Sequence, residues 1–307
     1  MRANPVIGVD VGGTKILAGV VTREGSVLRR ITRSTPVASQ DDLLAELDAV
    51  LAELLDAGDG VAAIGLGIPS RIDQRSGQAI ASTNVPLEGV PLRKRFAERF
   101  RIPVGLDNDA NAAAIGEWAF GAGRGTQDFL MLTLGTGVGG GIVLDGKPYR
   151  GATGSAAELG HMVVQFDGPP CQGTCTGRGH LEGLASGHAA DRAARSLIGP
   201  DATGADLVAR ARAGDEAARE AVFEIGRRLG SGIATLLNVF EPEVVAVGGS
   251  FGAAAFDFLL PGAGSVIQRD ALVPVRDRVR IEPAVLGAEA GLVGAGVVAL
   301  EALDGSA

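Results

Sequence analysis

The chain has 307 residues, a length that fits about two domains, and its 46% hydrophobic and 21% charged residues are ordinary for a globular protein. Its formal net charge of −8 gives no general attraction to nucleic acid or to an anionic membrane surface. It holds two cysteines, which argues against a disulfide framework.

No segment of the sequence suits export or membrane insertion. The N-terminal stretch MRANPVIGVD lacks an apolar core, and no run approaches about eighteen uninterrupted apolar residues. We therefore expect a cytoplasmic protein without a membrane partner. In such a reducing compartment the two cysteines are expected to bind a metal or to be buried as free thiols.

The first half of the chain alternates strand and helix patterns. Short apolar runs bounded by turn residues predict strands, and apolar residues at helical spacing predict helices. The predicted strands are 6–11, 15–22, 26–33, 61–69 and 101–109, and the predicted helices are 40–55, 93–101 and 110–120. The helix over 93–101 is rich in arginine and lysine, and we expect its basic side to be a solvated surface.

A second cycle of the same pattern begins near Asp128. The segment that starts at Ile7 can be aligned with the segment that starts at Leu130, a shift of 123 residues. In this alignment Thr133 corresponds to Asp10. Each copy reads as strand, glycine turn, strand. The repetition predicts two similarly built domains.

The later elements follow without a linker or a low-complexity tract. They are a helix over 215–239, a strand over 243–249, a helix over 253–268, a strand over 278–284 and a final helix over 288–303. We expect residues 1–120 to form a small N-terminal α/β domain, completed by the C-terminal helix at about 288–307. Residues 121–287 are expected to form a larger α/β domain.

Both copies of the repeat carry glycines where an apolar strand ends. Glycine lets backbone N–H groups approach a phosphate with no Cβ in the way, and such turns favour anions. Two such turns could hold one nucleotide. Asp10, at the end of the first strand, is placed to hold Mg²⁺ directly or through water, because hard cations take oxygen ligands.

Two other phosphate-binding motifs match less well. GIVLDGKP (141–148) fits part of a P-loop, but Pro148 stands where a hydroxyl residue would hold magnesium, and no helical pattern follows. GTGVGG (135–140) fits a dinucleotide fingerprint, which requires a helix at its third glycine, whereas the residues that follow read as strand and turn. A P-loop ATPase and a nicotinamide enzyme are both disfavoured.

Five motifs in their order and spacing resemble the ROK family of sugar kinases and repressors. They are IGVDVGGTKI, LDNDANAAAIGEW, LTLGTGVGGGIV, GATGSAAELGH and VVAVGGS, and together they span nearly the whole chain. The resemblance implies an α/β chain of the actin-like ATPase (ribonuclease H-like) fold, with two similar α/β domains and a cleft between them.

The same resemblance implies a nucleotide site. Residues that match the family's two phosphate loops, and its glycine pair near the adenosine, are expected to bind ATP and its Mg²⁺. The first loop is matched by Asp10, Gly12, Gly13, Thr14 and Lys15, the second by Thr133, Gly135, Thr136 and Gly137, and the pair by Gly248 and Gly249.

A sugar site is implied as well. Asn108 and Asp109 match the family's Asn-Asp pair at the sugar, in which the aspartate is the catalytic base. The chemistry agrees, because a sugar hydroxyl is a poor nucleophile until a carboxylate accepts its proton. Asp109 could also cap the helix that follows it. Further matches to sugar contacts are Glu158, His161 and Glu182, and weaker matches are Gly67 and Asn84.

In the family, a histidine followed by C-x-C-G-x-x-G-C supplies a tetrahedral zinc site. Here CQGTCTGRGH stands in that place, with three residues between the cysteines instead of one and a histidine where the third cysteine would be. Zinc accepts thiolate and imidazole alike, so a structural zinc held by His161, Cys171, Cys175 and His180 is expected, with a positional role. A metal-free loop with unpaired thiols is the alternative.

The activity that the resemblance implies is ATP-dependent phosphorylation of a hexose, with glucose as the first candidate. Fructose, mannose, allose and N-acetylhexosamines are the alternatives, and the motifs do not distinguish ATP from ADP or polyphosphate as donor. Because the first phosphate strand begins at residue 6, a DNA-binding segment ahead of it is not expected, which disfavours a sugar-responsive repressor. The expected partners are a small-molecule hexose and further copies of the chain, as a dimer or tetramer, and no nucleic acid.

Overall fold

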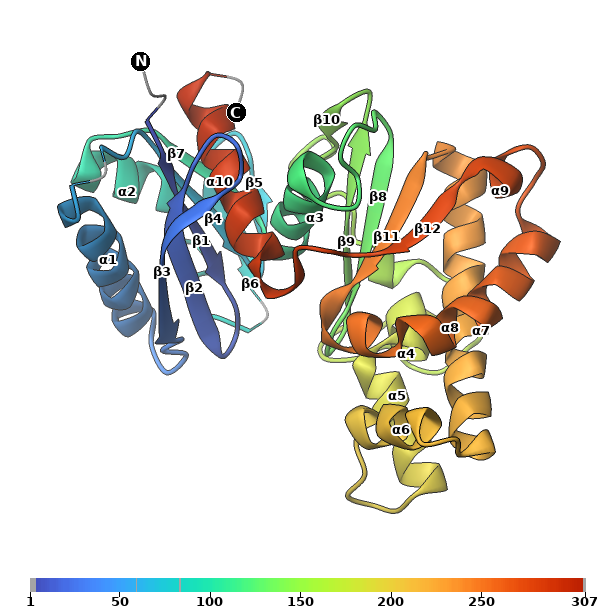
Figure 1. Ribbon diagram of the computed structural model, residues 1–307. Helices are drawn as coiled ribbons and strands as arrows, with labels where there is room; N and C mark the ends of the chain where they lie inside the picture. Colours follow the sequence, from blue (N-terminus) through green and yellow to red (C-terminus); the bar gives the residue numbers. More distant parts are fainter. Residues whose placement is uncertain (1–3, 59, 83, 306–307) are drawn as a thin grey trace. The chain divides into compact units, whose positions relative to one another are not determined.

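The computed structural model describes residues 4–58, 60–82 and 84–305, and it divides into two compact units (Figure 1). Unit 1 comprises residues 1–125, 148–157 and 288–307, and unit 2 comprises residues 126–147 and 158–287. Each unit is built around its own β-sheet.

Unit 1 has a five-stranded sheet in the order β3-β2-β1-β4-β7. Its strands are β1 (Val6–Val11), β2 (Lys15–Val21), β3 (Val27–Ser34), β4 (Ile64–Ile68) and β7 (Val104–Asn108). The first three form an antiparallel meander, and β4 and β7 add parallel to β1. The meander followed by crossover strands is the arrangement that the sequence predicts.

Helices cover both faces of this sheet (Figure 1). They are α1 (Gln40–Asp56) and α2 (Leu92–Phe100) on one face, and α3 (Asp109–Phe120) and α10 (Ala290–Leu303) on the other. Phe96 of the predicted basic helix is fully buried on the first face, and Lys94, Glu98 and Arg99 are exposed. Arg95 is partly buried and pairs with Asp48 at 2.7 Å, so the basic side is only in part a solvated surface. A short hairpin of β5 (Ser70–Asp73) and β6 (Gln78–Ser82) was not predicted.

A row of glycines lets α10 lie directly on the sheet. Gly8, Gly65 and Gly105 are register partners on three adjacent strands. A Cβ at Gly65 would collide with the backbone carbonyl of Ala295, and the other two positions would meet the α10 backbone in the same way. The last helix of the chain is therefore part of unit 1 because the sheet offers it a flat surface.

Residues 148–157 were expected in the second domain but pack in unit 1. Gln74 donates its backbone N–H to the carbonyl of Thr153 at 3.3 Å, and Arg150 binds Asp107 of β7. These contacts connect residues far apart in the sequence, which explains why the pattern of single segments did not predict them.

Unit 2 repeats the sheet of unit 1, in the order β10-β9-β8-β11-β12. Its strands are β8 (Phe129–Leu134), β9 (Val138–Leu144), β10 (Lys147–Pro148), β11 (Val244–Gly248) and β12 (Arg280–Pro283). The pair β8–β9 is an antiparallel hairpin, and β11 and β12 add parallel to β8. β9 begins at Val138, within GTGVGG, so a strand stands where a dinucleotide fingerprint needs a helix.

The helices of unit 2 follow the hairpin. They are η1 (Leu159–His161), α4 (Leu181–Ala185), α5 (Gly187–Leu197), α6 (Gly204–Arg212), α7 (Glu216–Phe240), α8 (Gly249–Asp270) and α9 (Val275–Arg278). η2 (Gly287–Glu289) begins at the last residue of unit 2 and ends in unit 1. α8 contacts β8, β11 and β12, and α7 runs along it (Figure 1). Among the described helices α8 alone has the length and apolar composition of a membrane span, but its strand and helix contacts are those of a core helix. It begins at Gly249, four residues before the predicted start.

Candidate functional site

The first glycine turn, residues 12–14, joins β1 to β2 in unit 1. Gly12 donates its backbone N–H to the carbonyl of Lys15 at 2.9 Å. From the end of β3, the Thr35 hydroxyl donates to the carbonyl of Gly12 at 2.7 Å, and the Thr35 backbone N–H donates to the carbonyl of Thr14 at 3.0 Å. Three strands therefore fix this turn.

Asn84 lies beside the first glycine turn. A Cβ on Gly13 would stand 3.3 Å from the Cβ of Asn84, so the absence of a side chain allows the turn to approach it. Asn84 itself is exposed, which leaves its amide within reach of a ligand. The weaker sequence match at Asn84 thus lies next to a residue of the expected phosphate loop.

Three parallel strands of unit 1 end in one row of residues. Asp10 of β1 pairs with Gly67 of β4, and Gly67 pairs with Asp107 of β7. A Cβ on Gly67 would lie 3.5 Å from the Cα of Asp109, so the glycine brings the end of β4 close to the expected base. The structure therefore brings the predicted residues Asp10, Gly67 and Asp109 together at the carboxyl ends of the unit 1 strands.

The turn from β7 into α3 is held by its own side chains. The side-chain oxygen of Asn108 accepts the backbone N–H groups of Ala110 at 2.9 Å and Asn111 at 3.2 Å, which makes Asn108 the N-cap. The cap that the sequence placed at Asp109 therefore belongs to Asn108. Asp109 is the first helical residue, and its carboxylate accepts the N–H of Ala110 at 2.9 Å.

Asp10 is the most perturbed carboxyl group of unit 1 for which a pKa is resolved. Burial and the negative charge of Asp109 raise the pKa of Asp10 to about 7, against the opposing effect of Lys15. A carboxylate that lies close to a second negative charge favours a bound cation, which would remove the repulsion. The oxygen donor of Asp10 is also the kind that Mg²⁺ prefers.

An ion-pair network that sequence reasoning missed supports the Asn108–Asp109 turn. Asp107 is fully buried, and its Oδ2 accepts from Arg150 Nε at 2.6 Å. The same guanidinium donates to Glu301 of α10 at 2.6 Å. The other oxygen of Asp107 accepts the backbone N–H of Asn108 at 2.9 Å. No spacing rule identifies Arg150, because 43 residues separate it from Asp107.

The second glycine turn, residues 135–138, joins β8 to β9 in unit 2. Gly135 donates its backbone N–H to the carbonyl of Gly137 at 3.0 Å. The N-terminus of α5 contacts the turn, where Gly187 donates to the carbonyl of Gly135 at 2.8 Å and His188 donates to the carbonyl of Thr136 at 3.5 Å. The turn is therefore positioned by a neighbouring helix as well as by its own strands.

The glycine pair at the end of β11 lies next to this turn. Gly248 pairs with Thr133 of β8. Gly249 has a φ of +79°, and a Cβ there would stand 2.5 Å from the carbonyl oxygen of Leu134, so a side chain has no room. The predicted residues of the second phosphate loop and the glycine pair are thus neighbours in one unit.

Two predicted sugar contacts in unit 2 differ in their surroundings. Glu182 accepts the backbone N–H of Val138 at 3.0 Å with one oxygen, and its other oxygen lies 3.7 Å from the sulfur of Cys171. Glu158 is exposed at the start of η1, where its carbonyl accepts the N–H of His161 at 3.0 Å. Glu182 is therefore fixed by the protein, whereas the Glu158 carboxylate faces solvent.

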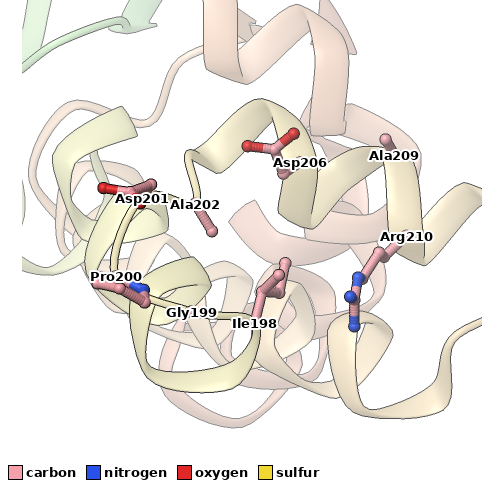
Figure 2. Close-up of a pocket in the computed structure, with 8 residues that line it drawn as sticks. All are labelled: Ile198, Gly199, Pro200, Asp201, Ala202, Asp206, Ala209 and Arg210. Carbon is pink, nitrogen blue, oxygen red and sulfur yellow. The ribbon is translucent and has the colours of Figure 1, made fainter.

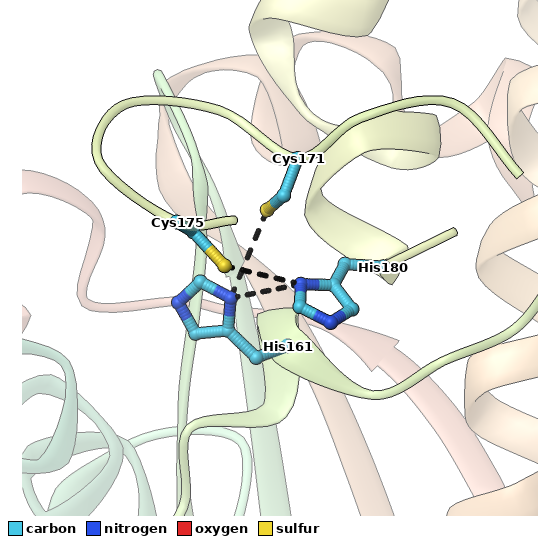
Figure 3. A group of neighbouring side chains, drawn as sticks. All are labelled: His161, Cys171, Cys175 and His180. Atoms are coloured by element: carbon cyan, nitrogen blue, oxygen red, sulfur yellow. Dashed lines mark hydrogen bonds between the residues drawn. The ribbon is translucent and has the colours of Figure 1, made fainter. Parts of the chain in front are cut away.

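The four predicted metal ligands converge (Figure 3). Their ligand atoms all lie within 4.8 Å of one another. The Nδ1 atoms of His161 and His180 are 3.2 Å apart, Cys171 Sγ lies 3.8 Å from His161 Nδ1, and Cys175 Sγ lies 3.6 Å from His180 Nδ1. A tetrahedral zinc with ordinary bond lengths sets nitrogens about 3.3 Å apart and a nitrogen and a sulfur about 3.6 Å apart. The donor set and its spacing therefore fit zinc.

The segment that carries these ligands, residues 161–182, is called the metal loop below. Between residues 162 and 180, all of them described, the only buried residues are Gly168 and Gly179, which have no side chains. Phe166 is 89% exposed, so even its largest apolar group makes no core. A loop without buried side chains needs another source of order, and a metal crosslink supplies one.

The Cys171 thiol would respond strongly to a metal. Burial raises the pKa of Cys171 to about 11, and the neighbouring Cys175 and Glu182 add to the effect, so without a cation the thiol keeps its proton at neutral pH. A bound cation reverses this preference, because coordination deprotonates a thiol. Binding of zinc is therefore expected to release a proton here.

A pocket of about 490 Å³ lies elsewhere in unit 2, around residues 198–202 and the start of α6 (Figure 2). Two of its charged groups, Asp206 and Arg210, already have partners. Asp206 accepts from the backbone N–H and the hydroxyl of Thr203 at 2.8 and 2.7 Å, and Arg210 lies 3.6 Å from Asp215. The pocket holds none of the residues singled out by the sequence, and its Asp206 takes part in the N-terminal cap of α6.

Comparison with known proteins gives a consistent picture. Residues 6–302 match the model of the ROK family. The chain is 35% identical to a glucokinase of Thermotoga maritima, over 98% of both chains, and 30% identical to a putative xylose repressor of Caldicellulosiruptor, over 94% of this chain and 76% of the repressor. It is also similar to the structure of a ROK family glucokinase from Streptomyces griseus in complex with glucose and AMPPNP, with a TM-score of 0.82, 35% identity and coverage of 97% and 99%.

Proposed function

The chain belongs to the ROK family, with its actin-like ATPase fold, and on this premise we propose that it transfers a phosphoryl group from ATP to glucose to give glucose 6-phosphate. The observation that carries the proposal is the meeting of Asp10, Gly67 and Asp109 at the edge of the unit 1 sheet. A kinase needs a base for the sugar hydroxyl and a cation site for the nucleotide, and this edge offers a carboxylate for each.

Asp109 is the proposed general base. As the phosphoryl group transfers, its carboxylate would accept the proton of the attacking sugar hydroxyl. The hydrogen bond from Ala110 and the cap made by Asn108 hold Asp109 at the helix start, so the base is positioned before the sugar arrives. Because phosphoryl transfer has a loose transition state, alignment of this kind supplies much of the acceleration.

The two glycine turns are proposed to bind the phosphates of ATP, and Gly248 and Gly249 to lie near the adenosine. When bound at Asp10, Mg²⁺ would neutralise charge on the phosphates. The backbone N–H groups of the turns add donors without a net negative charge. Lys15, which is exposed at the start of β2, is proposed to add a positive charge.

The residues proposed to contact the sugar are Asn108, Asp109, Glu158, His161 and Glu182, with Gly67 and Asn84 as further lining residues. His161 would serve two ligands. Its Nδ1 faces Cys171 and His180, so zinc at that nitrogen would leave Nε2 for a sugar hydroxyl. Zinc held by these residues and Cys175 would position the carboxylates and take no part in the chemistry.

A coupled assay with a panel of hexoses and donors tests the proposal. We expect glucose to have the highest kcat/KM among glucose, mannose, fructose, allose and N-acetylglucosamine, and ATP to exceed ADP and polyphosphate as donor. Folded protein that phosphorylates none of these sugars, with any donor, would refute it. Size-exclusion chromatography of the same preparation tests the further prediction of a dimer or tetramer.

A further inference from the structure

Residues at or beside both ends of the metal loop contact Val138, the last residue of the second glycine turn. Gly160, directly before the ligand His161, lies against the carbonyl of Val138, since a Cβ at Gly160 would collide with it. Two residues beyond the ligand His180, the carboxylate of Glu182 accepts the backbone N–H of Val138 at 3.0 Å. Both polar groups of the Val138 backbone therefore lie against residues next to a metal ligand.

Gln172 provides a third connection from within the loop. It follows the ligand Cys171, and its Nε2 donates to the carbonyl of Glu182 at 3.0 Å and to the hydroxyl of Ser186 at 2.8 Å. Its Oε1 is hydrogen-bonded to Nδ1 of His188. A glutamine amide has two N–H donors and one oxygen, so both ends of this amide are engaged.

The partners of Gln172 lie at the start of α5, which contacts the second glycine turn. Ser186 is fully buried and caps α5, and Gly187 donates its backbone N–H to the carbonyl of Gly135 at 2.8 Å. The backbone N–H of His188 lies 3.5 Å from the carbonyl of Thr136. The side chain of Gln172 is thus separated from the second glycine turn by a single layer of residues.

Between residues 162 and 180 the metal loop has no buried side chain, so a crosslink through Cys171 and Cys175 would fix the position of Gln172. We propose that the metal loop braces the second glycine turn, with Gln172 as a positioning residue, so that metal binding tightens the hold on the nucleotide phosphates. The proposal rests on the proposed function, in which this turn binds ATP.

The amide of Gln172 is occupied within the protein, so its replacement acts on a ligand only through the residues it holds. Of Glu182, Gln172 holds only the backbone carbonyl, whereas the Glu182 carboxylate, which is proposed to touch the sugar, is held by the N–H of Val138. The proposal therefore predicts an effect on one ligand and not on the other. Loss of Gln172 should weaken nucleotide binding and leave glucose binding close to normal.

The test measures binding of AMPPNP and of glucose by calorimetry, and zinc by elemental analysis, on full-length protein. For Gln172→Ala we expect AMPPNP to bind about tenfold more weakly, which corresponds to the loss of one or two hydrogen bonds. Zinc content and glucose affinity should stay within about twofold of wild type, a change of less than 0.5 kcal/mol. The control Gln165→Ala alters an exposed glutamine of the same loop and should match wild type.

A second arm removes the metal from wild-type protein with a chelator, with near-ultraviolet circular dichroism to verify that the protein stays folded. AMPPNP affinity should fall at least as far as in Gln172→Ala and return when zinc is added back. If Gln172→Ala does not fold, Gln172→Asn keeps the amide but is one methylene too short to reach its partners.

Unchanged AMPPNP affinity in the Gln172 variant, or in folded metal-depleted protein, would overturn the brace. If those proteins still phosphorylate glucose, the proposed function survives. Wild-type protein that binds no AMPPNP would instead refute the nucleotide site and, with it, the brace.

Discussion

The two units share one sheet topology but end their central strands with different residues. In unit 1 the row at the strand ends is Asp10, Gly67 and Asp107, whereas in unit 2 Thr133 pairs with Gly248, and a Cβ on that glycine would lie 2.9 Å from the Ala284 side chain. One row contains two carboxylates and the other a hydroxyl and a methyl group. The same frame is thus charged in one unit and neutral in the other.

This difference indicates how two similar units could divide the work. A neutral glycine turn binds phosphate through backbone N–H groups without repelling it. A carboxylate can take a proton or hold a cation but repels phosphate unless a cation lies between them. Unit 1 is therefore suited to base and cation chemistry, and unit 2 to holding the nucleotide. Each prediction below tests whether the carboxylates of unit 1 carry the function that this comparison assigns to that unit.

The largest effect is expected for Asp109→Asn. The amide cannot accept the proton of the sugar hydroxyl, so kcat should fall by about 10²–10⁴-fold. Glucose affinity, measured by calorimetry, should stay near wild type because an amide of the same shape keeps its hydrogen bonds. The control Asp304→Asn removes an exposed acid of unit 1 that pairs with Arg23, and it should keep its kcat. A near-normal kcat for Asp109→Asn would show that Asp109 is not the general base, and base chemistry could then not be assigned to unit 1 on this ground.

A large loss of stability is expected for Arg150→Met. The change leaves Asp107 buried with no positive charge beside it, and breaking such a pair costs about 3–5 kcal/mol in the free energy of unfolding. Urea denaturation measures it. The control is Arg280→Met in β12, the counterpart of β7, where Arg280 pairs with Glu282 on the surface and about 0–1 kcal/mol is expected. Equal effects of the two changes would mean that buried charge does not distinguish the units.

The sequence predicted the sheets better than the contacts between distant segments. The strand and turn pattern of residues 6–33 and its copy near residue 130 predicted both hairpins, because alternation and glycine are local signals. The hairpin of β5 and β6 was missed because Ser70–Asp73 and Gln78–Ser82 lack an apolar run. α8 starts earlier than predicted because the Gly249 turn could not be distinguished from a loop.

For the site, motif matches were enough to predict which residues form the glycine turns and that His161, Cys171, Cys175 and His180 lie together. The supporting residues could not be predicted. Arg150 and Gln172 act through partners that only the folded chain brings close, Asp107 and Ser186 among them. An isolated arginine or glutamine in a loop carries no period or spacing that distinguishes it from a solvated surface residue.

The smallest effect concerns Asp10 and pH. Its pKa of about 7 in the folded protein exceeds the value of about 4 in an unfolded chain, so between these values only the folded protein holds the proton. The contribution of Asp10 to stability is then full below about pH 4 and is lost as the pH rises through about 7. Measured without Mg²⁺, the unfolding free energy of wild type relative to Asp10→Asn should fall by about 2 kcal/mol across this window, less than the full shift would give because water reaches part of the side chain. The matched change Thr133→Val in unit 2 should give a difference independent of pH. If the difference in unfolding free energy between wild type and Asp10→Asn also stayed constant with pH, Asp10 would be no more sensitive to protonation than Thr133.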